Sequence, residues 1–467
     1  MLDVIKKDDF IKRYSKMILQ NKVAVFLGAG INVEVGLPTW IDLLRDIFED
    51  LKLEVKENID LALIAQFYIN EKGSERELLN IISEKINLQN KKPGKNLTSL
   101  TRLPIQQFWT TNYDDLLEKA LNNENKKYDS IYNKKQFYTA CRKYSIFKIH
   151  GDILNKEYLV FSKDSYDLYE KDRKFFWDKL SMELINKNFL FIGTSMEDTN
   201  LNLILSKVNM NVNKEDKSEH FIFLKDIKEH QKFERMFLQH KIKDLKTRFN
   251  IKTVLLEDYS ELSEIFNSIN SLILRKNIFI SGAAYSYKEF DNEINSKTFL
   301  YNLANELCKK QKKIISGFGL GVSDLIISGA VDYSKDNGTN LEEILDVWPF
   351  PQQSKKHDIN QIWNDYRNKI IEKSGVIIFV FGNKFDKKHN KIINSQGMME
   401  EFEIAKSQNK IIILIGSTGY MSKEILDLII KDIKDFKYLK DYLTILKSEK
   451  DYKKIVSIIV EILNKRK

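Results

Sequence analysis

Glycines gather in two short windows of a chain that otherwise uses few of them. Of 18 glycines in 467 residues, seven fall between Gly28 and Gly36 or between Gly317 and Gly329, and each window follows a strand-like run. Glycine tolerates positive φ and close backbone approach, and a glycine turn after a strand lets backbone N–H groups reach a phosphate. The windows therefore predict two sites for phosphate-bearing ligands, with a plain tight turn as the alternative at each.

Three polar residues after the first window are candidates for catalysis. His150 ends a strand-like run and precedes a glycine, unlike the other five histidines, and imidazole chemistry suits a general base near neutral pH. Asn112 and Asp114 follow the strand-like run at 107–111. The alternatives are a hydrogen-bonded structural histidine, an asparagine that forms a turn and an aspartate that caps the next helix.

The second half carries charges that suit a pyrophosphate. Arg367 precedes the strand-like run at 376–381, and Lys384 follows it. A guanidinium can hold phosphate oxygens through two parallel hydrogen bonds, whereas an ammonium acts as a point charge. Because lysine is abundant in this chain, a solvated surface charge remains the alternative for Lys384, and for Arg367 as well.

These residues need rigid elements to position them, and the hydrophobic pattern predicts two α/β blocks. Strand-like runs alternate with helical runs such as those at 40–51, 114–121 and 174–185, which is typical of doubly wound, mostly parallel sheets. We therefore expect two Rossmann-like domains, at 1–273 and 274–467. The predicted strands lie at 21–27, 107–111, 145–149, 158–161, 189–192, 220–224, 253–256, 277–281, 312–316, 376–381 and 410–415.

Composition excludes several classes of protein. The chain is 43% hydrophobic and 30% charged, as in globular domains and unlike disordered or fibrous proteins. Its two cysteines cannot build a disulfide framework or a four-thiolate zinc site. The formal charge of +9 is spread along the chain, and the apolar runs are far shorter than the roughly 18 residues of a membrane helix. We expect a cytoplasmic protein that binds neither nucleic acid nor membrane.

Four segments occur in the order of the sirtuin signatures. GAGINVEVGLP at 28–38 aligns without a gap with the sirtuin phosphate loop, and TTNYD at 110–114, KIHG at 148–151 and FIGTS at 191–195 resemble the later sirtuin motifs TQNID, histidine–glycine and GTS. This resemblance implies an NAD site. The residues that it implicates are Gly28, Ala29, Gly30, Ile31, Asn32, Pro38, Thr194, Ser195 and Asp198.

Departures from the sirtuin pattern argue against deacylation. The paired CxxC zinc knuckle is missing, and Asn32 and Val35 replace serines. The remaining pattern is similar to the sirtuin-like NAD-consuming domains of bacterial antiphage systems, which implies cleavage of the nicotinamide–ribose bond of NAD without a metal. His150 would then be the base, Asn112 would hold the ribose and the attacking water, and Asp114 would bind the carboxamide. A sirtuin-type protein deacylase is an alternative.

The C-terminal half resembles the SLOG domain, a nucleotide-binding relative of phosphoribohydrolases, over residues 275–467. Gln396 and Met398 replace a glycine and a threonine of the hydrolase motif GGxGTxxE, so we expect binding rather than catalysis. A phosphoribohydrolase acting through Glu400 is the alternative. The resemblance implies that the ligand is held by Ser281, Gly282, Ala283, Gly317, Phe318, Gly319, Leu320, Arg367, Gly382, Lys384 and Glu400.

A sirtuin-like domain followed by a SLOG domain resembles the effector family of the Thoeris antiphage system. The resemblance implies a bacterial homotetramer that a cyclic ADP-ribose isomer switches on, after which NAD in the infected cell is depleted. It also implies a TIR-domain partner that makes the activator. A nucleotide sensor or scaffold without catalysis is the alternative.

Overall fold

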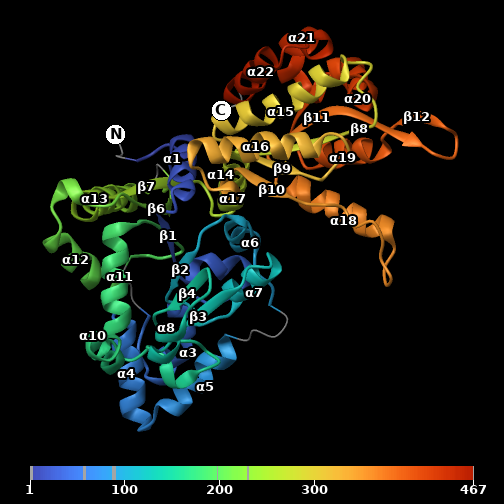
Figure 1. Ribbon diagram of the computed structural model, residues 1–467. Helices are drawn as coiled ribbons and strands as arrows, with labels where there is room; N and C mark the ends of the chain where they lie inside the picture. Colours follow the sequence, from blue (N-terminus) through green and yellow to red (C-terminus); the bar gives the residue numbers. More distant parts are fainter. Residues whose placement is uncertain (1–3, 56–58, 87–90, 197, 229–230, 466–467) are drawn as a thin grey trace. The chain divides into compact units, whose positions relative to one another are not determined.

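The computed structural model describes residues 4–55, 59–86, 91–196, 198–228 and 231–465 (Figure 1). It divides into two compact units, of which the first extends to Asn270 and the second begins at Ser271. The division falls within the helix α14 (Glu261–Leu274), which also contains the predicted boundary at 273/274. Within the described ranges, no helix is both long and apolar enough to cross a membrane.

The first unit is built on a seven-stranded parallel sheet in the order β3-β4-β2-β1-β5-β6-β7. All five residues of the central strand β1 are buried, as expected of a parallel strand that helices cover on both faces. The strands are β1 (Val23–Leu27), β2 (Gln107–Thr110), β3 (Tyr128–Ile131), β4 (Tyr144–Lys148), β5 (Asn188–Ile192), β6 (His220–Lys225) and β7 (Ile251–Leu256).

Helices cover both faces of this sheet because right-handed crossovers run outward from β1 in two directions. On one face α1 packs Phe10 and Tyr14 against Phe221, and on the other α11, α12 and α13 share a core with Phe191. The helices are α1 (Lys7–Leu19), α2 (Trp40–Leu43), α3 (Arg45–Asp50), α4 (Leu61–Lys72), α5 (Glu75–Lys85), α6 (Lys95–Arg102), α7 (Leu116–Asn123), α8 (Lys134–Thr139), α9 (Lys163–Asp167), α10 (Tyr169–Asp172), α11 (Lys174–Asn186), α12 (Thr199–Asn211) and α13 (Lys232–Phe249), with 3₁₀-helices η1 (Ala29–Val35), η2 (Lys156–Tyr158) and η3 (Lys214–Asp216).

Helices α2 to α5 form a separate hydrophobic cluster that fixes two loops. Their buried side chains, among them Ile47 and Tyr68, pack with Tyr113, Ile153 and Phe161. Tyr113 follows β2, whereas Ile153 and Phe161 follow β4. The cluster therefore anchors the segments that carry Asn112 and His150.

The chain changes direction in the sheet at β1, which it leaves toward β2 and later flanks on the other side as β5. The carboxyl ends of these two strands approach closely: the Gly28 amide donates to Ile192 O and the Gly30 amide to Gly193 O, both at 2.9 Å. A Cβ on Gly28 would lie 2.5 Å from the Gly193 carbonyl oxygen, and Gly193 has a φ of +66°. This approach therefore requires glycine on both sides.

The second unit contains a six-stranded sheet whose parallel part has the order β10-β9-β8-β11-β13. The antiparallel strand β12 pairs with the far end of β11, and this hairpin reaches beyond the other strands (Figure 1). The strands are β8 (Asn277–Ala284), β9 (Lys313–Ser316), β10 (Leu345–Val347), β11 (Val376–Asp386), β12 (Lys391–Asn394) and β13 (Ile411–Ile415).

The helices of the second unit pack in two groups, with α15 against α16 and α22 and with α18 against α19. This separation is what right-handed crossovers toward the two edges of the sheet produce. The helices are α15 (Glu293–Lys309), α16 (Ser323–Asn337), α17 (Leu341–Ile344), α18 (Ile359–Glu372), α19 (Gln396–Ser407), α20 (Tyr420–Lys431), α21 (Leu443–Ser448) and α22 (Tyr452–Lys465), with η4 (Gly416–Thr418) and η5 (Lys434–Tyr442).

The predicted α/β class with two doubly wound, mostly parallel sheets is confirmed. The strand predicted at 158–161 is wrong, because Lys156–Tyr158 forms η2 and the Val160 amide instead donates to His150 O at 2.9 Å. The helix predicted at 40–51 is divided at Leu44, and the first glycine window continues into η1 rather than an α-helix. The hydrophobic pattern misses β3, β10 and β12, which are short and only partly buried.

Replacing Gly193 with alanine tests the close approach of β1 and β5. A Cβ there would lie 2.4 Å from Ile31 N, so we expect Gly193→Ala to lower the free energy of unfolding by about 3 kcal/mol or more. Gly73→Ala is the matched control, because Gly73 has a φ of +70° and open space, and it should cost only about 1–2 kcal/mol. Denaturant titration of both variants measures the difference, and equal losses would contradict the packing argument.

Candidate functional site

The candidate catalytic residues lie at the carboxyl edge of the first sheet, beside the point where the chain changes direction. Asn112 and Asp114 follow β2, His150 follows the neighbouring β4, and Asn32 lies in η1 after β1. In open α/β sheets this crevice is where ligands bind. The structure therefore brings together side chains that are up to 118 positions apart in the sequence, from Asn32 to His150.

His150 is almost fully buried, with an exposed fraction of 3%. Its Nε2 lies 3.4 Å from Oδ2 of Asp198, although the two atoms are not aligned as a hydrogen bond. The Tyr166 ring contacts the imidazole edge to face, at 5.2 Å between centroids. Burial lowers the pKa of His150, while the carboxylate of Asp198 opposes this shift and Arg173 adds to it. The imidazole is thus neutral at physiological pH.

Asn32 and Asp114 form a buried pair. The Asn32 amide group donates to both carboxylate oxygens of Asp114, at 3.0 and 2.9 Å, and one of these oxygens also accepts from the Leu116 amide. Burial raises the pKa of Asp114, and the hydrogen bond from Leu116 opposes the shift. Asp114 thus holds the side chain of Asn32 in place and also binds the first amide of α7.

Asn112 is fixed at the end of β1. Its side-chain amide donates to Gly28 O at 3.2 Å, and its backbone amide donates to Thr110 Oγ1 at 2.9 Å. Among the described residues, neither Oδ1 of Asn112 nor Oδ1 of Asn32 has a hydrogen-bond partner, although both atoms are buried. Such atoms are uncommon in folded proteins and cost about 1–3 kcal/mol each. Two acceptors are therefore available for donors of a ligand.

A buried lysine connects the loops that carry these residues. Lys148 is fully buried and pairs with Asp152 and with Glu118, whose Oε1 lies 3.2 Å away. It also donates to Asp114 O at 2.6 Å and Tyr113 O at 3.3 Å. Although burial lowers the pKa of Lys148, the two carboxylates hold it above its usual value. The ammonium thus ties the loop after β2 to the loop after β4.

The first glycine window uses two of its amides within the fold. Gly28 and Gly30 donate to β5 and Gly193, so these two N–H groups do not face a phosphate. Ile31 and Asn32 are buried in η1, whereas Ala29 and Pro38 are partly exposed. The window therefore positions Asn32 and Asn112 as well as shaping the crevice.

A cleft of about 860 Å³ opens on the other side of β1. It includes Gly30 and the predicted NAD residues Thr194 and Ser195, next to Gly193. The rest of its wall comes from the end of β6, the segments after β6 and β7, and α13, and none of these residues was predicted from the sequence. They are Leu224, Lys225, Asp226, Ile227, Lys228, Gln231, Leu238, Lys241, Glu257 and Tyr259. The positions directly after the predicted strands at 220–224 and 253–256 are the signal that could have found several of them.

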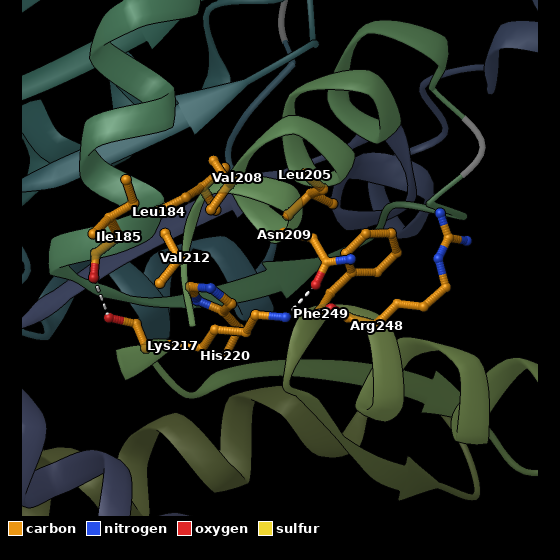
Figure 2. Close-up of a pocket in the computed structure, with 11 residues that line it drawn as sticks. Leu184, Ile185, Leu205, Val208, Asn209, Val212, Lys217, His220, Arg248 and Phe249 are labelled. Atoms are coloured by element: carbon orange, nitrogen blue, oxygen red, sulfur yellow. Dashed lines mark hydrogen bonds between the residues drawn. The ribbon is translucent and has the colours of Figure 1, made fainter. Parts of the chain in front are cut away.

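Figure 2 shows a much smaller cavity, of about 20 Å³, among α11, α12 and the start of β6. Its wall is mainly apolar, and His220 Nδ1 accepts from the Phe189 amide at 3.1 Å. Burial lowers the pKa of His220 to about 3. The cavity lies at the amino ends of the strands and has room for about one water, so His220 is a neutral structural residue.

In the second unit, the predicted ligand residues at the ends of β8 and β9 lie against each other. A Cβ on Gly319 would lie 1.9 Å from Gly282 O, and the Ala284 amide donates to Leu320 O at 2.8 Å. Phe318 and Leu320 are largely exposed, although both are apolar. Loops that pack backbone against backbone leave their side chains and remaining amides for a ligand.

Ser281 leads to a residue that the sequence analysis missed. Its Oγ donates to Oε2 of Glu401 at 2.5 Å. Glu401 is buried, and burial raises its pKa to about 7, which the Ser281 hydrogen bond and Arg367 oppose. Counted from Gly397, Glu401 rather than Glu400 occupies the glutamate position of the GGxGTxxE motif, and Gln396 falls at the variable position rather than at a glycine. This count is the signal that could have identified Glu401.

Arg367 lies between two glutamates on α19. Its Nη1 is 2.6 Å from Oε2 of Glu400, and its Nε is 3.8 Å from Oε1 of Glu401. The guanidinium also lies over the Phe350 ring at 5.5 Å and against the backbone of Gly397. The buried Nε has no hydrogen-bond partner among the described residues. Arg367 thus retains a donor for an anion.

Lys384 is placed differently from the sequence expectation. Strand β11 continues to Asp386, so Lys384 lies within the hairpin, exposed and opposite Ile393. Gly382, with a φ of +103°, lies at the bulge against Met398 and Met421. The structure brings Gly382 to the start of α19 and leaves Lys384 on the hairpin.

The raised pKa of Glu401 predicts a pH-dependent stability. The folded state keeps the proton up to about pH 7, whereas the unfolded carboxyl ionises near 4.5, so stability falls as pH rises between these values. We expect Glu401→Gln to remove this loss, on the order of 3 kcal/mol at full extent.

Calorimetric melting of the full chain from pH 5 to 7.5 should therefore show a gap that widens with pH, with Glu401→Gln melting progressively higher than the wild type. Glu403→Gln, an exposed position on the same helix, is the charge control. A gap that stays constant with pH would contradict the assignment.

Two families match the chain, one for each unit. The SIR2-like domain family matches residues 106–245, and the Sir2- and TIR-associating SLOG family matches residues 261–466. The first range contains Asn112, His150 and Asp198, and the second contains Ser281 and Arg367.

Bacterial relatives match nearly the whole chain. The NAD(+) hydrolase ThsA of Bacillus cereus (strain MSX-D12) is 36% identical over 431 residues, which cover 89% of this chain and 88% of that protein. The ThsA proteins of Enterococcus faecium and Cytobacillus dafuensis are 34% and 32% identical, and cover 92% and 98% of this chain and 92% and 96% of their own lengths. The chain therefore belongs to the ThsA family, in which a SIR2-like domain precedes a Sir2- and TIR-associating SLOG domain.

Proposed function

We propose that the first unit hydrolyses NAD⁺ to ADP-ribose and nicotinamide. The observation that carries the proposal is a buried, neutral imidazole at the same sheet edge as two buried amide oxygens, on Asn32 and Asn112, that have no partners among the described residues. The cleft of about 860 Å³ across β1 has room for the second half of a dinucleotide. The names of the ThsA relatives support NAD⁺ as the substrate.

The reaction needs positioned polar groups more than a strong acid. Breaking the nicotinamide–ribose bond releases a neutral pyridine from a pyridinium and leaves an electron-poor ribose carbon. Oδ1 of Asn112 would accept from a ribose hydroxyl or from the attacking water. Oδ1 of Asn32, which Asp114 orients, would accept from the nicotinamide carboxamide, so Asp114 acts on this group through Asn32.

His150 would take the proton of the water. The water oxygen bonds to the ribose carbon, the electron pair of the broken bond stays on the nicotinamide nitrogen, and the proton moves to the imidazole. A base must be unprotonated, and burial of His150 favours this form at neutral pH.

Replacing the proposed base and the water-holding amide tests this assignment. We expect His150→Ala and Asn112→Ala each to reduce NAD⁺ hydrolysis at least about 100-fold, since general-base catalysis contributes about 10²–10⁴-fold. NAD⁺ binding, measured by calorimetry, should weaken far less. His240→Ala, at an exposed position on α13, is the histidine control. Full activity of His150→Ala would remove the proposal.

We further propose that the second unit binds a cyclic ADP-ribose isomer, which activates the first. Such a ligand carries a pyrophosphate, for which the free donor of Arg367 is suited, and hydroxyls that Ser281 and Glu401 could bind. The TIR-associating description of the SLOG family supports a TIR-domain enzyme as the source of the ligand. We also propose a homotetramer in the bacterial cytoplasm, as the family resemblance implies.

An enzyme that destroys NAD⁺ must be almost inactive at rest. Moving a two-state equilibrium from 1:99 to 99:1 requires a ligand that favours the active state by roughly 5.5 kcal/mol. Several charge-assisted hydrogen bonds, at about 1.5–3 kcal/mol each, can provide that difference. A ligand that carries a pyrophosphate, such as a cyclic ADP-ribose isomer, is therefore a physically sufficient activator.

Replacing Arg367 tests the activator site. We expect Arg367→Ala to raise the concentration of cyclic ADP-ribose isomer needed for half-maximal NAD⁺ hydrolysis about 10- to 100-fold, which corresponds to one lost charge-assisted contact. Lys369→Ala, exposed on the same helix, is the control. Activation of Arg367→Ala at wild-type concentrations would move the site elsewhere.

A further inference from the structure

We propose that Asp198 is a positioning residue for His150, holding one nitrogen of the imidazole so that the other nitrogen faces the water. This inference rests on the proposed hydrolysis of NAD⁺ and gives Asp198 a role other than the direct NAD contact that the sirtuin resemblance implies. The two roles make different experimental predictions.

The two carboxylate oxygens of Asp198 have different partners, one at the start of a helix and the other at the imidazole. Asp198 is the N-cap of α12, and its Oδ1 accepts from the Leu201 amide at 2.8 Å. Its Oδ2 faces the other way, 3.4 Å from Nε2 of His150 and 3.3 Å from the hydroxyl of Tyr166. The side chain is only 15% exposed. The helix thus fixes one oxygen and thereby aims the other at the imidazole.

The groups around His150 make Asp198 the counter-charge. Tyr166 of α9 and Tyr169 of α10 contact the ring. The charges of Asp198 and Arg173, which act on His150, also act on Tyr113 after β2. Arg173, which follows α10, is the other charged residue that acts on the imidazole, and it disfavours a second positive charge there. Asp198 is therefore the negative group that stabilises the imidazolium formed during the reaction.

A carboxylate at one ring nitrogen also fixes where the proton resides. When Nε2–H points to Asp198, the lone pair lies on Nδ1, which then accepts the proton of the attacking water. The short gap of 3.4 Å closes with a small rotation of the imidazole, and catalytic hydrogen bonds commonly tighten when the substrate binds. Asp198 thus orients the base and raises its affinity for the proton.

Asp198→Asn separates this role from the others. Asparagine is as good an N-cap as aspartate, so the variant keeps the start of α12 while removing the charge. We expect kcat to fall about 10- to 100-fold, as part of the 10²–10⁴-fold that a general base contributes, with little change in KM for NAD⁺.

The pH profile gives the more specific readout. Because Asp198 raises the pKa of His150, its removal lowers that pKa, and the acid limb of kcat/KM should move to lower pH. Tyr166→Phe removes the neighbouring hydroxyl without changing the charge, so the acid limb of its kcat/KM profile should stay at the wild-type pH. Asp198→Ser, which also keeps an N-cap, serves as the second variant.

The activity assays use the full chain with each member of a panel of cyclic ADP-ribose isomers, and the wild type beside each variant. An NMR titration of the histidine rings, with the His150→Ala spectrum identifying the signal, measures the His150 pKa without catalysis. If the wild type fails to hydrolyse NAD⁺, the proposed function fails while the titration still tests the contact. An unmoved His150 pKa, or a higher KM with an unmoved acid limb, would overturn the role of Asp198.

Discussion

The backbone contact between the ends of β1 and β5 fixes the chain path on which Asn32 and Asn112 of the N-terminal site depend. Because Gly28 and Gly30 use their amides on β5 and Gly193, the chain after β1 folds back across the sheet edge. This path puts Asn32 beside Asp114 and leaves Gly28 O as the acceptor that fixes Asn112. A side chain on any of these glycines would separate the two halves of the crevice.

Burying the polar groups of the site costs little free energy because most of them are paired with one another. Burial of an unpaired ammonium on Lys148 would strongly destabilise the fold, but Glu118, Asp152 and two backbone carbonyls surround it. Asp114 is likewise satisfied by Asn32 and by an amide of α7. Such networks are costly to break, since removal of one member leaves the others unpaired. By contrast, Oδ1 of Asn32 and Oδ1 of Asn112 have no hydrogen-bond partner among the described residues.

Much of the fold follows from the sequence because buried parallel strands are short apolar runs bounded by glycine or polar residues. The run at 23–27 and the one at 411–415 are of this kind, and both form strands. The segment 158–161 has the same composition but folds against the α2–α5 cluster, which only tertiary packing decides. Motifs located His150 and Asn112, whereas the approach of Asp198 to His150 depends on where α12 begins. Glu401 was missed because its neighbour Glu400 was assigned to the glutamate position of the GGxGTxxE motif, one residue too early.

The ion pair between Arg367 and Glu400 has a consequence for selectivity. Glu400 neutralises the guanidinium of Arg367, so a phosphate or chloride must displace an existing ion pair to bind. Its binding free energy is only the difference between the new ion pair and the one that it replaces. An anion that makes a single contact is thus a poor competitor. A ligand that also engages the glycine loops of β8 and β9 adds contacts that the tethered carboxylate cannot match. In the proposed activator site, Glu400 would therefore favour multivalent ligands over small anions.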